Sequence, residues 1–370
     1  MKKAIITGIT GMDGSYLAEL LIKKGYVVVG VVRRTSQNSF ANLVGVKNSP
    51  NLILEEGDIT DYSSLIRILT KHNDVAEIYN LAAQSHVATS FKQPGLTWDI
   101  TGKGCLNLLQ AIVDLNLQAK VRFYQASSSE MFGKSYDQAV VGLEIDVNRL
   151  SQEIVEKYQD ENTKFLPQSP YAISKCAAHY AVRLYREAYG LHASAGILFN
   201  HEGIRRGEEF VTRKITKWIG KYLKWLKTVG INDSNISASC STGELLYASG
   251  MAFSFPKLRL GNIDASRDWG SASDYVQAMW MMLQQDKADD YVICTGETHT
   301  VREFLDEAFR AAGIENWEYC VFIDPEFYRP AEVDYLKGNS SKARKVLGWK
   351  PTTSFKELVR EMTLHDISNA

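Results

Sequence analysis

The sequence predicts an α/β protein built on a doubly wound parallel sheet. Short apolar segments rich in β-branched residues alternate with segments of helical periodicity through roughly the first 130 residues. A glycine-rich turn joins the first strand to the first helix. In such an alternation the strands run parallel, the helices cover both faces of the sheet, and ligands bind beyond the carboxyl ends of the strands. Polar residues at those ends are therefore the candidates for a functional site.

The expected elements of the first half follow one another regularly. AIIT at 4–7 is a β run, and from Ser15 to Lys24 apolar residues recur at helical spacing until Gly25 ends the segment. VVVGVV at 27–32 is apolar throughout, which is typical of a strand buried on both faces. Further strands and helices are expected at 52–57, 61–72, 76–83, 99–116 and 121–127.

The second half is less regular. A long helix is expected over 169–190, ended by Gly190, and an apolar strand over 193–199. Residues 211–230 predict an amphipathic helix, and packing of its apolar face on the core explains the pattern better than a membrane surface does. The apolar face consists of Ile215, Trp218, Ile219, Tyr222 and Leu226. The Ser/Gly-rich stretch 232–256 predicts a long loop or a loose hairpin.

The composition is that of an ordinary globular protein with a large core. The 370 residues are 45% hydrophobic and 23% charged, with a formal net charge of −1, which gives no support for a nucleic-acid partner. No apolar run is long enough to span a membrane and no secretion signal is evident, so we expect a cytoplasmic protein without a membrane partner. The cysteines show no paired spacing, which favours reduced thiols over disulfides or a metal site: Cys105, Cys176, Cys240, Cys294 and Cys320.

The turn after the first expected strand predicts a nucleotide site of the Rossmann type. Gly8, Gly11 and Gly14 let the chain turn tightly, let backbone amides reach a pyrophosphate, and open a helix whose N-terminus carries a positive dipole end. A glycine triplet alone is weak evidence. Its place between a strand and a helix, with a second strand about 20 residues further on, makes the prediction specific.

The end of the second strand favours NADP over NAD. NAD sites place an acidic residue there for the ribose hydroxyl, whereas this chain has Arg33-Arg34-Thr35-Ser36, which suits a 2′-phosphate. Asp58 ends the third strand. Its carboxylate either accepts a hydrogen bond from the adenine amino group or caps the following helix.

A Tyr–Lys pair and a serine-rich strand end predict hydride-transfer chemistry. Tyr171 and Lys175 lie four residues apart, so both reach the same helix face. Ser128 and Glu130 lie at the end of the strand at 121–127. The Lys175 ammonium and a positive nicotinamide are expected to favour the phenolate of Tyr171, which takes a hydroxyl proton while Ser128 binds the same oxygen.

Long segments of the chain, in order from residue 3 to about 365, resemble the GDP-mannose 4,6-dehydratase family. They are TGITGMDGSYLAELL, RRTS, NLAAQSHVATSF, FYQASSSEMFG, QSPYAISK, LFNHEG with IRRGEEFVTRKI, LGNIDASRDWGSASDYV and FYRPAEVDYLKGNSSKARKVLGWKP. The resemblance implies conversion of GDP-D-mannose to GDP-4-dehydro-6-deoxy-D-mannose and water, with NADP as a recycled hydride carrier. It places the acid/base that moves the C5 proton at Glu130.

The resemblance also implies the organisation of the chain. Residues 1–200 mainly bind NADP and contain an insert near 134–166. Residues 201–370 form a smaller mixed α/β domain that mainly binds the nucleotide sugar and contains an insert near 228–257, with some chain crossing between the two. The segment Arg33 to Leu43 resembles an arm that reaches a neighbouring subunit's cofactor, so a homodimer or homotetramer is expected.

Individual contacts follow from the same resemblance, and no metal is expected. Contacts to the cofactor are implied for Gly8, Gly11, Asp13, Gly14, Arg33, Arg34, Asp58, Ile59, Leu81, Ala82, Ala83, Ser85, Tyr171, Lys175, Leu198, His201 and Arg206. Contacts to the substrate are implied for Ser85, Asn200, Val211, Lys214, Arg267, Arg329 and Glu332.

The sequence departs from the family at several places. Ser128 replaces a more usual Thr, Gln168 replaces an Arg, and Gly203-Ile204 stands where Ser-Pro is usual. Within the first insert, residues 146–162 predict an added amphipathic helix. The two inserts leave another nucleotide-sugar 4,6-dehydratase open as an alternative.

Glu130 distinguishes the remaining rival functions. A 4-epimerase or 4-reductase of the same fold needs no acid/base at this position. A catalytically silent NADP-binding regulator would be expected to lack Tyr171, Lys175 or Glu130, and all three are present.

Overall fold

The computed structural model describes residues 1–35, 40–144, 152–233, 236–238, 244–247 and 254–370. Its centre is a seven-stranded sheet in the order β16-β8-β5-β4-β1-β2-β3, and every neighbouring pair is parallel. The predicted fold class is therefore confirmed. The strands are β1 Lys3–Thr7, β2 Val27–Val32, β3 Leu52–Glu56, β4 Glu77–Asn80, β5 Arg122–Ser128, β8 His192–Leu198 and β16 Asp290–Ile293.

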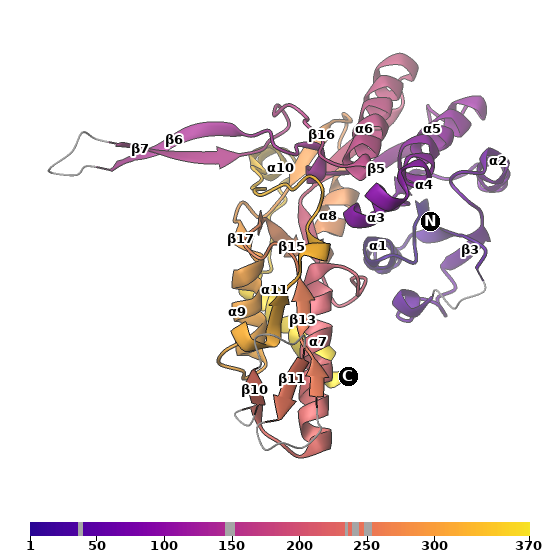
Figure 1. Ribbon diagram of the computed structural model, residues 1–370. Coiled ribbons are helices and arrows are strands. Elements are labelled where there is room, and N and C mark those ends of the chain that lie inside the picture. The colour runs from indigo at the N-terminus through magenta and orange to yellow at the C-terminus, as the bar shows by residue number, and fades with distance from the viewer. Residues whose placement is uncertain (36–39, 145–151, 234–235, 239–243, 248–253) are drawn as a thin grey trace.

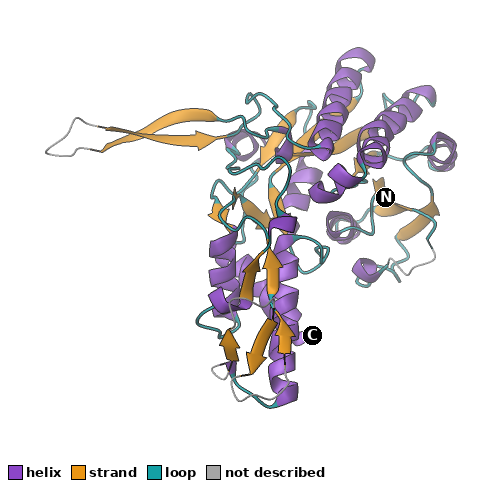
Figure 2. Ribbon diagram, viewed as in Figure 1, coloured by secondary structure: helices purple, strands orange, loops and turns teal. Residues whose placement is uncertain are grey.

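Alternating side chains of the strands divide the interior into two apolar layers. On one face, Ile6 and Tyr124 pack with residues of α1 (Met12–Lys23) and α8 (Ala272–Met282). On the other, Ile5 and Phe123 pack with α2 (Tyr62–Lys71), α5 (Gly104–Asp114) and α6 (Pro170–Tyr189). Figure 2 shows these helices around the sheet. Neighbouring residues of a strand point to opposite faces, so both faces of the apolar strands are buried.

Local sequence signals set the ends of the long helices. Ser169 caps α6 by accepting a hydrogen bond from the amide of Ala172, and Pro170 occupies its first turn. Gly190 ends the helix with φ of 65°, a left-handed conformation that glycine adopts without strain. The helix expected at 99–116 instead begins at Pro94 and contains a π-helical turn, Trp98–Lys103, before α5.

The C-terminal half packs around a third apolar core. Its helices are α7 (Val211–Val229), α9 (Val301–Ala311) and α11 (Phe355–Ser368), and the five predicted apolar residues of α7 are all buried there. Residues 272–293 return to the large sheet as α8 and β16, so the chain crosses between the two halves. Short paired strands complete this half: β9 Asn200–Glu202 with β15 Trp269–Ser271, β13 Leu258–Leu260 with β18 Val321–Ile323, and β14 Ser266–Arg267 with β17 His299–Thr300. The expected domain boundary at residue 200 stays a prediction.

The helix expected within 146–162 is wrong. The described part of this insert is an antiparallel hairpin of β6 (Asp137–Glu144) and β7 (Gln152–Tyr158), which projects from the body in Figure 1. Val140 faces Val155, and a bulge follows between Val140 and Gly142. Cross-strand pairing of β-branched residues outweighs the helical spacing, and such pairing is invisible when one segment is read alone. Residues 145–151 lie outside the described residues.

The stretch 232–256 is also more regular than expected. Its described parts are three short antiparallel strands, β10 (Ile236–Ala238), β11 (Glu244–Tyr247) and β12 (Ser254–Pro256). Leu245 is buried, and the ring of Phe255 contacts those of Trp218 and Tyr222 on α7. The helix therefore supplies the apolar surface on which these strands form, a contribution that the local sequence does not contain.

Candidate active site

A cleft of about 1500 Å³ opens where the carboxyl ends of the large sheet meet the C-terminal half. It is lined by every predicted site residue except Arg34. Residues of β1, β2, β5 and β8 and the segments after β3 and β4 contribute from the sheet, and the segments after β9, β13 and β18 contribute from the other half. This is the position that a doubly wound sheet assigns to a ligand.

The glycine turn is packed too closely to hold side chains. Gly8 has φ of 70°, and a Cβ there would lie 2.9 Å from the amide nitrogen of Ala82. A Cβ on Gly14 would lie 2.3 Å from the carbonyl oxygen of Gly8. The turn thus requires glycine for its own conformation, and it directs the N-terminus of α1 into the cleft, as a pyrophosphate needs.

Asp13 and His201 form a half-buried, hydrogen-bonded pair beside this turn. Their side chains approach to 2.9 Å, and the other ring nitrogen of His201 donates to the carbonyl oxygen of Phe199. Burial raises the pKa of Asp13, but the charge of His201 and its hydrogen bond outweigh burial and leave that pKa below its usual value. Burial lowers the pKa of His201, and Asp13 reverses this and raises it. Among the described residues Asp13 Oδ1 has no hydrogen-bond partner, so it is available to a ligand hydroxyl.

The end of the cleft next to β2 and β3 contains residues predicted to contact the adenosine part of a cofactor. Arg33 lines it after β2, whereas Arg34 does not, and Ser36 lies outside the described residues. Asp58 accepts from the backbone and hydroxyl of Thr60, at 2.8 and 2.7 Å. The cap of α2 is Asp61, which accepts from the amide of Ser63, so the capping alternative for Asp58 is wrong. Its contact with adenine stays a prediction.

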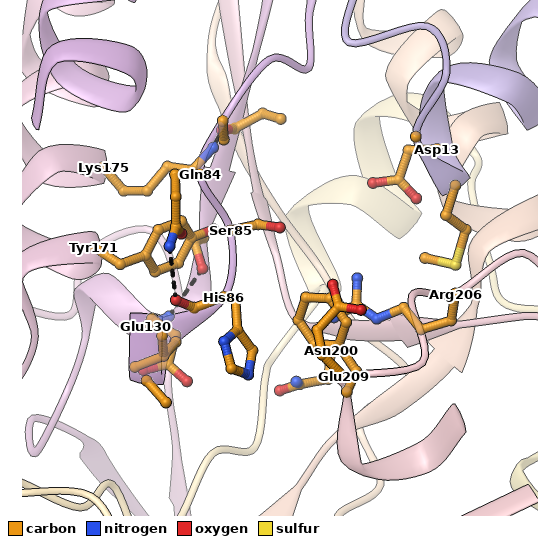
Figure 3. A pocket seen from close by; sticks show the side chains of 18 of the residues that line it. Asp13, Gln84, Ser85, His86, Glu130, Tyr171, Lys175, Asn200, Arg206 and Glu209 are labelled. Atoms are coloured by element: carbon orange, nitrogen blue, oxygen red, sulfur yellow. Dashed lines mark hydrogen bonds between the residues drawn. The ribbon is translucent and has the colours of Figure 1, made fainter. Parts of the chain in front are cut away.

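Tyr171 and Lys175 project from one face of α6 into the cleft, and both are buried (Figure 3). The Lys175 ammonium donates to the carbonyl oxygen of Ala126 at 2.7 Å, and burial lowers its pKa to about 8. Burial raises the pKa of Tyr171 to about 12, against a smaller opposing effect of the hydrogen bond with Ser128. The expectation that Lys175 lowers the phenol pKa is therefore not met by the protein's own groups, because desolvation dominates and the ammonium is directed at Ala126.

Glu130 lies on the same side of the cleft, in the turn that follows β5. Its backbone amide donates to Ser128 Oγ at 3.3 Å, which fixes the turn. The residue is only 9% exposed, so it is not a surface carboxylate. Its partner across the cleft is Arg329, 3.5 Å away, which also approaches Glu332 at 3.8 Å. Two predicted substrate ligands and the predicted acid/base thus form one charge network.

Arg206 and Lys214 are predicted site residues on the wall that the C-terminal half contributes. Arg206 approaches Glu202 at 3.1 Å and lies 3.5 Å over the ring of Phe210. Lys214 on α7 lies 3.8 Å from the centre of the Phe327 ring, and burial lowers its pKa. This wall offers cationic and aromatic groups to a nucleoside diphosphate.

Several lining residues were missed by sequence reasoning. His86 hydrogen-bonds Thr89 at 2.7 Å and meets the ring of Phe210 edge-on, and Glu209 faces the same space (Figure 3). His86 follows the end of β4, where the strand-end rule could have found it. Glu209 and Phe327 come from loops of the C-terminal half and carry no local signal.

In the described ranges, no three His, Cys, Asp or Glu side chains gather in a way that could hold a metal ion. In the same ranges, no helix combines the length and apolarity needed to cross a membrane.

The fold and the site define the class of protein. The sequence model of the NAD dependent epimerase/dehydratase family matches residues 4–294, and the chain belongs to this family. The fold resembles that of a dTDP-glucose 4,6-dehydratase from Streptomyces venezuelae, with a TM-score of 0.76 at 22% identity, over 98% of this chain and 96% of that one.

Within this class the chain is a member of the GDP-mannose 4,6-dehydratase family. GDP-mannose 4,6 dehydratase 1 of Arabidopsis thaliana is 46% identical over 380 residues, covering 100% of this chain and 91% of that protein. The GDP-mannose 4,6 dehydratase of Dictyostelium discoideum is 44% identical, over 99% of this chain and 96% of that protein. The GDP-mannose 4,6 dehydratase model also matches residues 249–362.

Proposed function

We propose that this chain is a hydro-lyase that converts GDP-D-mannose to GDP-4-dehydro-6-deoxy-D-mannose and water. The observation that carries the proposal is the gathering of a phenol, an amine, a hydroxyl and a carboxylate in one cleft, next to the glycine turn. The full-length similarity to GDP-mannose 4,6-dehydratases supports the same activity.

We propose NADP as the cofactor of this cleft. The glycine turn, the unpartnered Asp13 Oδ1 and the exposed Arg33 and Arg34 after β2 suit a dinucleotide with a 2′-phosphate. When bound, NADP accepts a hydride from C4 of the sugar and returns it at C6, so it is not consumed. Residues proposed to hold it are Gly8, Gly11, Asp13, Gly14, Arg33, Arg34, Asp58, Ile59, Leu81, Ala82, Ala83, Ser85, Tyr171, Lys175, Leu198, His201 and Arg206.

Tyr171, Ser128 and Lys175 manage the proton at the C4 oxygen. Tyr171 takes the C4 hydroxyl proton on its phenolic oxygen, and Ser128 hydrogen-bonds the same substrate oxygen. Lys175 places a positive charge beside the phenol and is held by Ala126. Because burial alone raises the pKa of Tyr171, the phenol needs added positive charge in the closed site before it can act as a base.

Glu130 supplies the acid/base step that distinguishes a dehydratase. A ketone at C4 makes the C5 proton acidic; Glu130 removes this proton and delivers it to the departing C6 hydroxyl, so one water leaves. A 4-epimerase or 4-reductase requires no such group. The buried position of Glu130 beside Ser128 therefore favours dehydration.

The C-terminal wall is proposed to bind the nucleotide sugar. Ser85 binds the hexose, Asn200 lies near the diphosphate, and Val211 and Lys214 lie near the guanine. Arg267, Arg329 and Glu332 bind phosphate, sugar and ribose oxygens, and their mutual ion pairs hold these side chains at the cleft.

We further propose a cytoplasmic homodimer or homotetramer. Helices α5 and α6 leave a row of large apolar side chains exposed, of which Leu184 is 57% exposed. Such a row on a soluble protein marks an interface. The row consists of Leu106, Ile173, Tyr180 and Leu184.

The cysteines support the proposed cytoplasmic location, because free thiols suit a reducing compartment. Cys105, Cys176, Cys294 and Cys320 are unpaired, and Cys240 lies outside the described residues.

A substrate panel tests the proposed function. The chain is incubated with NADP and, separately, with GDP-mannose, UDP-glucose and dTDP-glucose, and the products are weighed by mass spectrometry. We expect GDP-mannose to lose the mass of one water without accumulation of NADPH. Water loss from only the UDP or dTDP sugar would reject the substrate, and an isobaric epimer as product would reject the reaction.

A further inference from the structure

Helix α6 is held against the end of β5 by a stripe of three polar side chains. Tyr171, Lys175 and His179 follow one another at four-residue spacing, so they share one face of the helix. Each contacts a different one of three successive residues of β5: Lys175 donates to the carbonyl oxygen of Ala126, His179 Nδ1 lies 3.0 Å from Ser127 Oγ, and Tyr171 hydrogen-bonds Ser128. The proposed reaction uses the first and third pairs and leaves the middle pair without a role.

The middle pair is itself anchored to the sheet. His179 is 5% exposed, and its Nε2 lies 3.7 Å from Asp290 Oδ2 on β16. Asp290 is held in turn by the guanidinium of Arg186, which also donates to the carbonyl oxygen of Ala193 on β8. The network thus connects α6 to three adjacent strands, β5, β8 and β16.

The charges around His179 fix the direction of its hydrogen bond. Burial lowers the pKa of His179 and the opposing charge of Asp290 does not restore it, while Arg186 and Arg183 lower it further. The ring is therefore neutral near pH 7, with one donor and one acceptor nitrogen. Asp290 can only accept, so the proton belongs on Nε2. Nδ1 then accepts from the hydroxyl of Ser127.

We propose that His179 is a positioning residue for the dehydration reaction, acting through Ser127. By fixing the middle of the stripe it sets the register of α6 on β5, and so holds the phenol of Tyr171 against the hydroxyl of Ser128. His179 does not line the cleft, so it touches neither substrate nor cofactor. Displacement of catalytic groups by about 1 Å is enough to cost on the order of 100-fold in rate. The inference rests on the proposed function and names a residue that this function did not require.

Two amide variants separate positioning from mere stability. In His179→Asn the amide oxygen occupies the place of Nδ1 and can still accept from Ser127. In His179→Gln the amide reaches toward Asp290 and leaves the Ser127 hydroxyl unpaired. Both variants keep a polar, uncharged side chain and lose the ring, so their folding losses are comparable.

The rate is measured as kcat per active site, with active sites counted by stoichiometric GDP binding, alongside KM for GDP-mannose. We expect kcat to fall at least about tenfold in His179→Gln and in Ser127→Ala, with KM unchanged, and His179→Asn to restore most of the loss. The double variant Ser127→Ala/His179→Gln should be no slower than either single variant, because both remove the same bond.

Equal kcat per active site in the Asn and Gln variants, with a loss only in melting temperature, would overturn the positioning role. Additive losses in the double variant would overturn the route through Ser127. Wild-type turnover in the same assay separates the two proposals. If the wild-type chain dehydrates GDP-mannose and the variants match it, only this inference fails; if the wild-type chain dehydrates no nucleotide sugar, the proposed function fails and the inference falls with it.

Discussion

At the scale of single residues, the site holds an ammonium in a place that disfavours its charge. Burial lowers the pKa of Lys175 to about 8, whereas a lysine in the unfolded chain titrates near 10.4. Between these values the folded protein binds fewer protons than the unfolded chain, so its stability rises with pH in this window. Below about pH 8 the cost of burying the charge is fully present.

Lys175→Met should therefore stabilise the protein while abolishing its activity. We expect a gain on the order of 1–3 kcal/mol in unfolding free energy at pH 7, measured by denaturant titration, which shrinks as the pH approaches 10. The hydrogen bond to Ala126 opposes the gain, and its loss keeps the estimate modest. A variant that is less stable than the wild type at pH 7 would contradict this account of Lys175.

Ser128 offers a second test, because only its hydroxyl is needed. Ser128 is buried and hydrogen-bonds the phenol of Tyr171, so Ser128→Ala should lower kcat by about 10- to 100-fold with little change in KM. Ser128→Thr keeps the hydroxyl and serves as the matched control, retaining most of the rate. Equal losses in both variants would show that side-chain volume, and not the hydrogen bond, limits the reaction.

Single site residues could be predicted where a reactive side chain lies at a position that the fold class assigns to a ligand. The strand-end rule found Ser128 and Glu130, and helical spacing found Tyr171 with Lys175; the structure brings all four into one cleft. The pKa of Tyr171 was not predictable, because it depends on burial by residues distant in sequence. His179 was also missed, since its partner Asp290 is more than 100 residues away.

At the scale of elements, the parallel sheet and its helices were predictable because each of these strands and helices carries its own pattern of apolar residues. The hairpin of β6 and β7 was not, since the two strands pair with each other and such pairing cannot be read from either segment alone. None of the hairpin side chains that the structure describes belongs to the three largest apolar clusters. Its base is held by the bond of Tyr335 to the carbonyl oxygen of Lys157 and by the ion pair of Lys337 with Glu156.

Shortening the hairpin should consequently leave the enzyme intact. Asp137 and Tyr158 face each other across the two strands, so an Asn-Gly turn can replace residues 138–157. We expect kcat/KM for GDP-mannose to stay within about twofold and the unfolding free energy to change by about 0.5 kcal/mol or less. A large loss of turnover in a folded variant would assign the hairpin a part in the site.

At the scale of the whole molecule, the cleft exists because two halves of the chain meet over the sheet edge. Arg329, from the segment after β18, reaches Glu130 at the end of β5. A contact between residues this far apart in the sequence cannot be predicted from a local pattern. The same scale governs assembly. In the part of the chain that the structure describes, the apolar row on α5 and α6 is left exposed, so a second copy is the proposed cover.

Charges placed in that row should dissociate the assembly. The double variant Tyr180→Glu/Leu184→Glu is expected to reduce the mass measured by light scattering to that of a smaller species, with the helix itself intact by circular dichroism. Exposed Lys345→Glu, on α10 (Ser341–Leu347), provides a charge-matched control outside the row. An unchanged mass for the double variant would place the interface elsewhere.

The central claim is that Glu130 moves the C5 proton, and the most direct measurement follows Glu130→Gln through its first turnover. With NADP and GDP-mannose, we predict that NADPH absorbance rises and persists while water loss, followed by mass spectrometry, slows by at least about 100-fold. In this variant, oxidation at C4 still proceeds, whereas dehydration becomes much slower. Dehydration at the wild-type rate, with no accumulation of NADPH, would remove Glu130 from the reaction.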